Sequence, residues 1–515
     1  MSSTEEHPWD LPSNWQWVTM DQISEVVGGG TPNTKDPANF GGPIPWITPA
    51  DMSDHVGKLI GEGTRSISEQ GLAGSGARWL PQGAVLFSSR APIGYTAIAS
   101  RTLTTNQGFK SFVPYEGVAS DYVYHWLSSA KQHAEKLASG TTFPEISGAK
   151  AALIPFPLAP TLEQTRIVEK LEELLSDLDA GVAELKAAQR KLAQYRQSLL
   201  KAAVEGTLTT DWRAARVRSG EPQETGADLL QRILNERRAS REAKQLAKYA
   251  EQGKSPPKGW RTKFPEVVSA DQINFAVLPK SWTWSSLGEC FFVAVGATPS
   301  RKEPRYWGGN IAWVSSGEVR FERIAQTRET ITSEGLNKTS TQINPKGSVL
   351  LGMIGEGKTR GQVAILDIDA ANNQNCAAIW VPETKIAPEY VYYWLWSRYD
   401  ETRRGSSGNN QPALNKKIVE AIPFPLPPLN EIRQIVELVE SALTQVAGQE
   451  AAIEHALKQV TAQRKNILKA AFAGQLVPQD PNDEPANALL ERIRTERANL
   501  TGTAKPRGRK PRTTA

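Results

Sequence analysis

The chain contains the same segment twice, and this internal repeat constrains the fold more than any other feature of the sequence. The first copy opens with Leu-Pro-Ser-Asn-Trp-Gln-Trp at 11–17, and the second opens with Leu-Pro-Lys-Ser-Trp-Thr-Trp at 278–284. The pairs Asn106-Gln107 and Asn373-Gln374 match at the same displacement of 267 residues. The repeat predicts two similar globular domains.

Both copies close with Ile-Pro-Phe-Pro-Leu, at 154–158 and 422–426. Closely spaced prolines are excluded from helix interiors and from central strands, so this motif marks the end of each globular domain. Within the copies, short apolar runs such as 85–87 and 363–366 are bounded by Gly, Pro and Asn, which predicts short strands.

After each boundary, apolar residues recur every seven positions, with no insertion or deletion between the copies. They are Leu171, Leu178, Leu185, Leu192 and Leu199 in the first copy, and Val439, Val446, Ile453, Val460 and Ile467 in the second. One such stripe fits an ordinary core helix as well as a coiled coil, but two copies in the same register favour pairing. Each helix would span about 40 residues, or about 60 Å.

The predicted fold class is therefore α+β, with two similar globular domains separated by two long antiparallel helices that form a coiled coil. Antiparallel pairing gives a pseudo-twofold repeat with one globular domain at each end. A charged stretch at 226–252 predicts a further helix, and its sequence at 228–233 has an echo at 488–493.

Composition excludes several classes of protein. The 515 residues are 39% hydrophobic and contain no apolar run near the ~18 residues of a membrane span. The N-terminal residues lack a secretory signal, so we expect a cytoplasmic protein. Only Cys290 and Cys376 are present, and the five histidines are scattered, so neither a disulfide framework nor a metal site is expected.

One motif formally matches a phosphate-binding loop, because residues 352–359 read Gly-Met-Ile-Gly-Glu-Gly-Lys-Thr. Such a loop must open a helix, whereas residues 360–366 read as a strand. We interpret the motif as a glycine-rich surface loop. No dinucleotide fingerprint or nucleophile elbow occurs, so the sequence predicts a protein without catalytic residues.

Several residues could contact nucleic acid, and the net charge of +5 is compatible with such an anionic partner. The amides of Asn106 and Asn373 suit bidentate contact with adenine, although turn or core roles are the alternative. Loops at 139–144 and 405–412 hold small polar residues that can approach a DNA backbone. The DNA-binding candidates are Arg78, Arg90, Asn106, Gln107, Lys110, Thr141, Thr142, Lys358, Arg360, Asn373, Gln374, Arg403, Arg404, Ser406 and Asn409.

Tryptophans and the basic tail give weaker signals. Trp15, Trp17, Trp282 and Trp284 could stack on bases, but their repeated place at each domain's start favours packing. The basic segment 505–512 is broken by Pro and Gly, which predicts a disordered tail with occasional phosphate contact.

Taken together, these motifs resemble the specificity subunit of a type I restriction-modification system. The resemblance covers nearly the whole chain and rests on the two Leu-Pro-x-x-Trp-x-Trp openings, the two proline boundaries, and the segments that follow them. Those segments read Glu-Gln-Thr-Arg-Ile-Val at 163–168 and Glu-Ile-Arg-Gln-Ile-Val at 431–436. The family's Glu-Gln-Arg core is interrupted in the first copy and reordered in the second.

The resemblance implies a non-catalytic, DNA-binding subunit of a host-defence system, in which each globular domain reads one half of a bipartite, asymmetric target. The helical rod would set the spacer between the halves and dock methyltransferase subunits. The predicted boundaries are 1–160 for the first target-recognition domain, 161–206 for the first long helix, 207–270 for a linker with a charged helix, 271–428 for the second target-recognition domain, 429–474 for the second long helix, and 475–515 for a helix and a basic disordered tail.

The implied partners are double-stranded DNA, two adenine-N6 methyltransferase subunits and two restriction subunits that translocate and cleave DNA. No cofactor is expected on this chain, because S-adenosylmethionine, ATP and Mg²⁺ would act on the partner subunits. Two alternatives stay open at this point: a coiled-coil adaptor without DNA readout, and an enzyme that hydrolyses nucleotides at residues 352–359.

Overall fold

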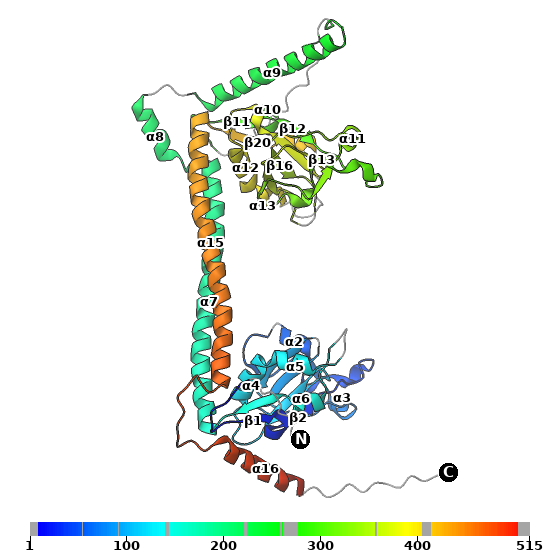
Figure 1. Cartoon of the computed structure of the whole chain (residues 1–515), viewed down its shortest axis with the longest axis vertical. Helices are drawn as coiled ribbons and strands as arrows, with labels where there is room; N and C mark the ends of the chain where they lie inside the picture. The colour runs from blue at the N-terminus through cyan, green and yellow to red at the C-terminus, as the bar shows by residue number, and fades with distance from the viewer. Residues whose placement is uncertain are drawn as a thin grey trace, which may run out of the picture. The chain divides into compact units, whose positions relative to one another are not determined.

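A computed structural model describes residues 9–53, 55–90, 92–139, 144–220, 224–257, 260, 277–355, 358–403 and 414–502. The chain divides into two compact units, Met1–Lys186 with Glu454–Ala515, and Ala187–Ile453. Each unit holds one globular domain together with a part of each long helix. Figure 1 labels many of the elements of both units.

The first globular domain is built on a five-stranded sheet in the order β2-β9-β6-β7-β4 and a three-stranded sheet in the order β5-β3-β8. Its strands are β1 (Gln16–Thr19), β2 (Ser24–Gly28), β3 (Phe40–Ile47), β4 (Leu59–Ile60), β5 (Arg65–Ile67), β6 (Val85–Ser89), β7 (Ile93–Ala99), β8 (Thr104–Thr105), β9 (Lys110–Pro114) and β10 (Pro155–Leu158). Its short helices are α1 (Met20–Ile23), η1 (Pro37–Asn39), α2 (Pro49–Ser53), α3 (Glu69–Ala73), α4 (Ser120–Ser129), α5 (Lys131–Leu137) and α6 (Gly148–Ala152).

The second globular domain repeats this architecture, with sheets in the orders β12-β19-β16-β17-β14 and β15-β13-β18. Its strands are β11 (Thr283–Ser286), β12 (Phe292–Val295), β13 (Trp307–Val314), β14 (Arg323–Ile324), β15 (Glu329–Ile331), β16 (Val349–Gly352), β17 (Val363–Leu366), β18 (Ala370–Asn372), β19 (Cys376–Trp380) and β20 (Pro423–Leu426). Its short helices are α10 (Leu287–Cys290), η3 (Pro304–Tyr306), η4 (Ser316–Glu318), α11 (Ser333–Asn337), η5 (Val381–Glu383), α12 (Pro388–Ser397), α13 (Tyr399–Arg403) and α14 (Lys416–Glu420). The prediction of two similar α+β domains is confirmed, as are the strands at 85–87 and 363–366.

The proline motif forms the last strand of each domain. Strand β10 pairs antiparallel with β1, and β20 pairs with β11, each in a ribbon of two strands. Prolines are tolerated there because a strand in a two-stranded ribbon has one edge without a partner, where no N–H is needed. The ribbon returns the end of each domain to its beginning, just before a long helix starts.

The long helices are α7 (Thr161–Val204) and α15 (Leu429–Phe472), each of 44 residues. In the second unit Arg196 pairs with Glu450, while the chain just after α7 reaches Glu431 near the start of α15, so the helices run antiparallel. In the first unit they are joined by Arg464 and Asp179. The two helices lie side by side in each unit (Figure 1).

The ten heptad residues are all at least partly buried in the structure. Leu171, Leu199, Val439 and Val446 are buried, and the other six heptad residues are half-buried. Partial exposure is expected, because a pair of helices covers only one stripe of each partner.

The helix that follows each long helix packs against the domain of the other copy. Helix α9 (Gly226–Glu251) follows α7, and its Leu229 and Ile233 enter the core of the second domain. Helix α16 (Ala486–Gly502) follows α15, and its Leu489 and Ile493 enter the core of the first domain. The sequence predicted both helices but not this exchange. A shorter helix, α8 (Thr210–Ser219), lies between α7 and α9.

A buried carboxylate at the start of each long helix holds the segment that follows the other long helix. Glu163 accepts hydrogen bonds from Trp15 Nε1, at 2.9 Å, and from Gln479. Burial raises the pKa of Glu163, and these hydrogen bonds oppose the shift. Glu431 accepts from Thr209 Oγ1 at 2.7 Å and pairs with Arg213 at 2.5 Å. Glu163 and Glu431, the first residues of the matching segments 163–168 and 431–436, therefore have a structural role.

Candidate nucleic-acid interface

The predicted asparagine anchors form the same tight turn in both domains. The side-chain oxygen of Asn106 accepts a hydrogen bond from the backbone amide two residues ahead at 2.8 Å, and Asn373 does the same at 3.1 Å. Such turns are typical of asparagine. This geometry favours the turn role, which was the alternative to base contact, and it leaves the following residues, Gln107 and Gln374, exposed.

Three segments meet at this turn in the first domain. The backbone amide of Ser89 donates to Gly108 O at 2.7 Å, and the amide of Ile146 donates to Ser89 O at 3.0 Å. Gly30 lies against the same place, since its amide donates to Thr105 O at 2.9 Å. We call the described residues of 28–31, 88–93, 106–110 and 144–148 the first edge.

Three predicted residues gather at the first edge. Lys110 Nζ donates to the backbone oxygen of Gln107 at 3.3 Å, and Arg90 lies 3.8 Å from Glu145. Burial lowers the pKa of Lys110, and the charge of Arg90 lowers it further while Glu145 opposes the shift. A nearby anion would favour the charged form of Lys110 by electrostatic attraction. Lys150, which the sequence did not single out, donates to Ser139 at 2.6 Å on the neighbouring segment.

Arg78 lies on another loop that borders the first edge. Gly30 is so close to this loop that an added Cβ would meet Ala77 N at 2.1 Å. Arg78 itself is exposed, and the adjacent Trp79 is 49% exposed. Trp79 was missed because an isolated tryptophan carries no pattern in the sequence.

The second domain assembles the corresponding edge from the same three segments. The amide of Met353 donates to Asn375 O at 2.8 Å, and the amide of Leu414 donates to Met353 O at 3.2 Å. Gln374 Oε1 accepts from Thr298 Oγ1 at 2.5 Å. We call the described residues of 296–299, 352–362, 373–376 and 414 the second edge.

Predicted cations cluster at the second edge around Tyr399. The Tyr399 hydroxyl donates to the backbone oxygen of Lys358 at 2.8 Å, and the guanidinium of Arg403 lies 5.3 Å from the Tyr399 ring centre. Arg360 Nη2 donates to the backbone oxygen of Arg403 at 3.4 Å. Lys358 is exposed and Arg360 is half-buried. The structure thus brings these three basic residues together from two segments.

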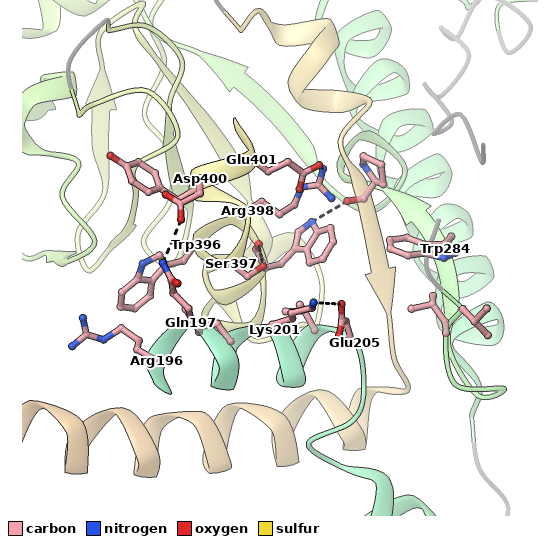
Figure 2. A pocket seen from close by; sticks show the side chains of 17 residues that line it. Arg196, Gln197, Lys201, Glu205, Trp284, Trp396, Ser397, Arg398, Asp400 and Glu401 are labelled. Carbon is pink, nitrogen blue, oxygen red and sulfur yellow. Dashed lines mark hydrogen bonds and ion pairs between the residues drawn. The ribbon is translucent and has the colours of Figure 1, made fainter. Parts of the chain in front are cut away.

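Helix α13, which carries Tyr399 and Arg403, is held to α7. Gln197 on α7 donates to Asp400 at 3.3 Å, and the guanidinium of Arg196 lies 5.9 Å from the ring centre of Trp396. Figure 2 shows Gln197 beneath Asp400, with Trp396 beside them. The second edge is therefore tied to the long helix of its own unit.

A cavity of about 580 Å³ lies between α7 and the second domain (Figure 2), and its lining includes Trp284 and Trp394. In the first domain, Trp9 packs against the counterparts of these tryptophans. Its ring centre lies 5.6 Å from that of Trp17 and 6.2 Å from that of Trp126. Trp15 and Trp282 are buried, so the packing interpretation of the repeated tryptophans holds for these two.

Five predicted site residues, Thr141, Thr142, Arg404, Ser406 and Asn409, lie outside the described residues, as does the basic segment 505–512.

The motif that resembles a phosphate-binding loop connects two antiparallel strands. It runs from the end of β16 to a turn at 358–360, and β17 pairs antiparallel with β16. Among its described residues no helix follows Thr359, so the amides and dipole of a helix N-terminus are missing there. The interpretation as a glycine-rich surface loop agrees with this geometry.

Two further features are absent from the described part of the chain. No helix there is both long enough and apolar enough to cross a membrane. Nor do three or more His, Cys, Asp or Glu side chains come together there as metal ligands could.

The fold and its two edges define a class of protein: two homologous domains, each displaying a polar, basic edge, joined to a pair of long antiparallel helices. The chain matches the model of the type I restriction modification DNA specificity domain over residues 12–187 and 279–459. It belongs to this family, whose members are non-catalytic specificity subunits, and it is a DNA-recognition subunit.

Individual relatives agree with this assignment. The chain is 24% identical over 502 residues to the EcoDI specificity subunit of Escherichia coli, and this alignment covers 96% of this chain and 97% of that protein. It is 36% identical over 193 residues to the MjaIX specificity subunit of Methanocaldococcus jannaschii, and this alignment covers 37% of this chain and 44% of that protein. The HsdS subunit from Thermoanaerobacter tengcongensis shares the fold, with a TM-score of 0.51 at 18% identity over 91% of this chain and 99% of that one.

A chain from a structural study of complex assembly in the type I R-M system also shares the fold. It superposes with a TM-score of 0.64 at 19% identity, covering 91% of this chain and 100% of that one.

Proposed function

We propose that each edge reads one half of a bipartite, asymmetric DNA sequence. The observation that supports this is that both edges use the same asparagine turn but surround it with different side chains. Arg90 and Lys110 lie at the first edge, whereas Lys358, Arg360 and Arg403 lie at the second. Since base contacts specify sequence, unlike edges are expected to select unlike half-sites.

The long helices are proposed to set the spacer between the half-sites. Both have 44 residues, and their heptads stay in register, as expected for a ruler whose length is under constraint. Inserting four residues after position 186 and four after position 453 adds about one helical turn, or about 6 Å, to both helices. The unspecified spacer should then lengthen by one or two base pairs, and an unchanged spacer would contradict the ruler.

The remaining chemistry is proposed to reside on partner subunits. Two adenine-N6 methyltransferase subunits would use S-adenosylmethionine, and two restriction subunits would use ATP and Mg²⁺ to translocate and cleave DNA. This chain would supply recognition and the surface on which the methyltransferase subunits dock.

The test is single-molecule sequencing of DNA from cells that express this chain together with its methyltransferase subunit, scored for N6-methyladenine. We expect a bipartite, asymmetric motif that disappears when the gene for this chain is deleted. Replacing residues 1–160 with the domain of another family member should change one half of the motif. A change in both halves, or no motif that depends on this chain, would reject the proposal.

A further inference from the structure

The loop between β13 and β15 of the second domain, residues 315–328, carries two exposed arginines that the sequence did not single out. They are Arg320 and Arg328, and together they border an open hollow of about 550 Å³. Within the described part of the chain neither arginine forms an ion pair, and the Nε of Arg320 donates to Gly317 O at 2.6 Å. Their charge is therefore available to an anion.

Three other charged residues, Glu318, Glu322 and Arg323, also line the hollow, and the first and last of them are engaged in contacts of their own. The carboxylate of Glu318 accepts from the backbone amide and hydroxyl of Ser315, both at 2.9 Å, and from the amide of Arg328 at 2.9 Å. Arg323 is paired with two carboxylates outside the loop. Glu322 is exposed at the hollow, and its charge raises the pKa of Tyr392, though less than burial does.

A strained residue directly follows Arg320 in the chain. Phe321 has φ of 61°, which places it in the left-handed region, and no other non-glycine residue in the described ranges has a positive φ. Its ring is stacked on Trp396, with ring centres 5.2 Å apart. Its amide donates to Val363 O at 2.8 Å, and its oxygen accepts from the Tyr392 hydroxyl at 2.7 Å. A backbone conformation that costs energy is retained because these contacts determine it.

The loop continues the second edge. It begins where β13 ends, and Val314 O accepts from the backbone amide of Asn373 at 3.0 Å, at the start of the asparagine turn. The Phe321 ring also packs edge-on against Tyr399, with centres 5.0 Å apart, and Tyr399 is the residue around which Lys358 and Arg403 gather. The residue that follows Arg320 thus packs against the basic cluster of the second edge.

We propose that Arg320 and Arg328 bind backbone phosphates of DNA next to the half-site that the second domain reads, and that Phe321 is a positioning residue for Arg320. This inference rests on the proposed function. Guanidinium groups suit phosphate because they present paired donors to its oxygens. Strands β4 and β5 match β14 and β15 at a displacement of 264, and at this displacement the first domain holds Val56 and Thr64 in place of the two arginines, so these contacts belong to the second half-site alone.

The test measures duplex binding by the full chain assembled with its methyltransferase subunit, at salt concentrations from about 50 to 300 mM. The double variant Arg320→Ala/Arg328→Ala should reduce the slope of log affinity against log salt by about one to two, because each phosphate contact contributes about one unit. The methylated motif should stay the same, since phosphate contacts carry no sequence information. Lys385→Ala, an exposed lysine beyond the far end of β19, serves as the control.

A wild-type slope in the double variant would overturn this inference. If the wild-type complex itself shows no salt-dependent binding, the proposed function fails instead, so the two failures are distinguishable. Phosphate ethylation interference then localises the contacts: the two phosphates should lose their effect in the double variant, and they should flank one half-site only. Interference that is unchanged, or that flanks both half-sites, would also overturn it.

Phe321 is tested with two substitutions that differ in whether stacking on Trp396 is kept. Phe321→Ala should lower the salt slope by about one, as Arg320→Ala does, whereas Phe321→Tyr should retain the wild-type slope. If both behave like the wild type, Phe321 has no positioning role. Thermal unfolding of each variant separates a local effect from loss of folding.

Discussion

The two edges differ in places where the rest of the two domains agree. Between β3 and β4 the first domain has three residues more than the second domain has between β13 and β14, whereas the β16–β17 hairpin has three residues more than the β6–β7 hairpin. Both differences lie in loops next to the asparagine turn. The long helices have no such difference, with 44 residues in each. Variation is therefore concentrated at the edges, while the framework that carries them is constant.

The largest expected effect is on DNA binding and on the methylated motif, and it distinguishes the roles of the two edges. The double variant Lys358→Ala/Arg360→Ala should weaken binding of the cognate duplex by at least tenfold and relax the second half of the methylated motif, because a base contact is worth about 1–3 kcal/mol. The matched variant Arg90→Ala/Lys110→Ala should relax only the first half. Methylation sequencing with both variants checks this. Relaxation of both halves by either variant would break the comparison.

The buried glutamates are expected to differ in their contribution to stability. Glu431→Ala removes the partner of Arg213, whose side chain is 19% exposed, and should cost about 3–5 kcal/mol, as breaking a buried ion pair does. Glu163→Ala leaves the Trp15 indole N–H without its acceptor and should cost about 1–3 kcal/mol. Urea unfolding measures both losses of folding free energy, and hydrogen exchange shows in which unit each loss occurs. The variant Glu437→Ala, at an exposed position, serves as the control. Equal losses of folding free energy would show that Glu163 and Glu431 stabilise the protein to the same extent.

A pH dependence is expected in the first unit alone. Burial lowers the pKa of His125 and His133, with Glu172 opposing the shift at His125 and Lys136 reinforcing it at His133. As the pH falls, these histidines therefore take up protons in the unfolded chain before they do so in the folded chain. The stability that the neutral histidines provide is complete above about pH 6.5 and is lost as the pH falls through their folded-state pKa. Each histidine contributes at most about 1.4 kcal/mol per pH unit.

The second unit provides the internal control, because residues 187–453 contain no histidine. Peptide-resolved hydrogen exchange at pH 7.5 and 5.5, corrected for the intrinsic exchange rate, should show destabilisation of the first unit only. His125→Phe/His133→Phe should remove most of it. Equal destabilisation of both units would mean that other groups control the response.

The smallest effect concerns the ion pairs between the long helices. Arg196→Ala should cost about 0.2–1 kcal/mol, because its pair with Glu450 is only partly exposed. Arg464→Ala should cost less, because its partner Asp179 is 64% exposed and the pair is well solvated. Urea unfolding in low and high salt compares them. A larger loss for Arg464 would reverse the expected order.

Local patterns explain why much of the fold was predictable. The heptads from Leu171 to Leu199 and from Val439 to Ile467 repeat a spacing that only a helix can place on one side, so the two long helices followed directly. The strands at 85–87 and 363–366 were predicted from apolar runs and their flanking residues. The exchange of α9 and α16 between the copies was not predicted, because their similar sequences at 228–233 and 488–493 do not indicate which domain each helix packs against.

The candidate site was only partly predictable. Asn106 and Asn373 were singled out correctly as matching anchors, but whether an asparagine closes a turn or offers its amide to a base depends on the backbone around it. Arg320 was not found, because a single arginine in a loop carries no periodic pattern in the sequence.

The sequence by itself determined that this protein has two similar domains and two paired helices, because the repeat and the heptads are periodic features that can be read along the chain. Only the tertiary structure decided which polar residues share an edge. The strand order β12-β19-β16-β17-β14 brings together segments near residues 298, 320, 358 and 374 that are far apart in the sequence. Contacts between such segments depend on hydrogen-bond register and side-chain packing, which no local pattern encodes.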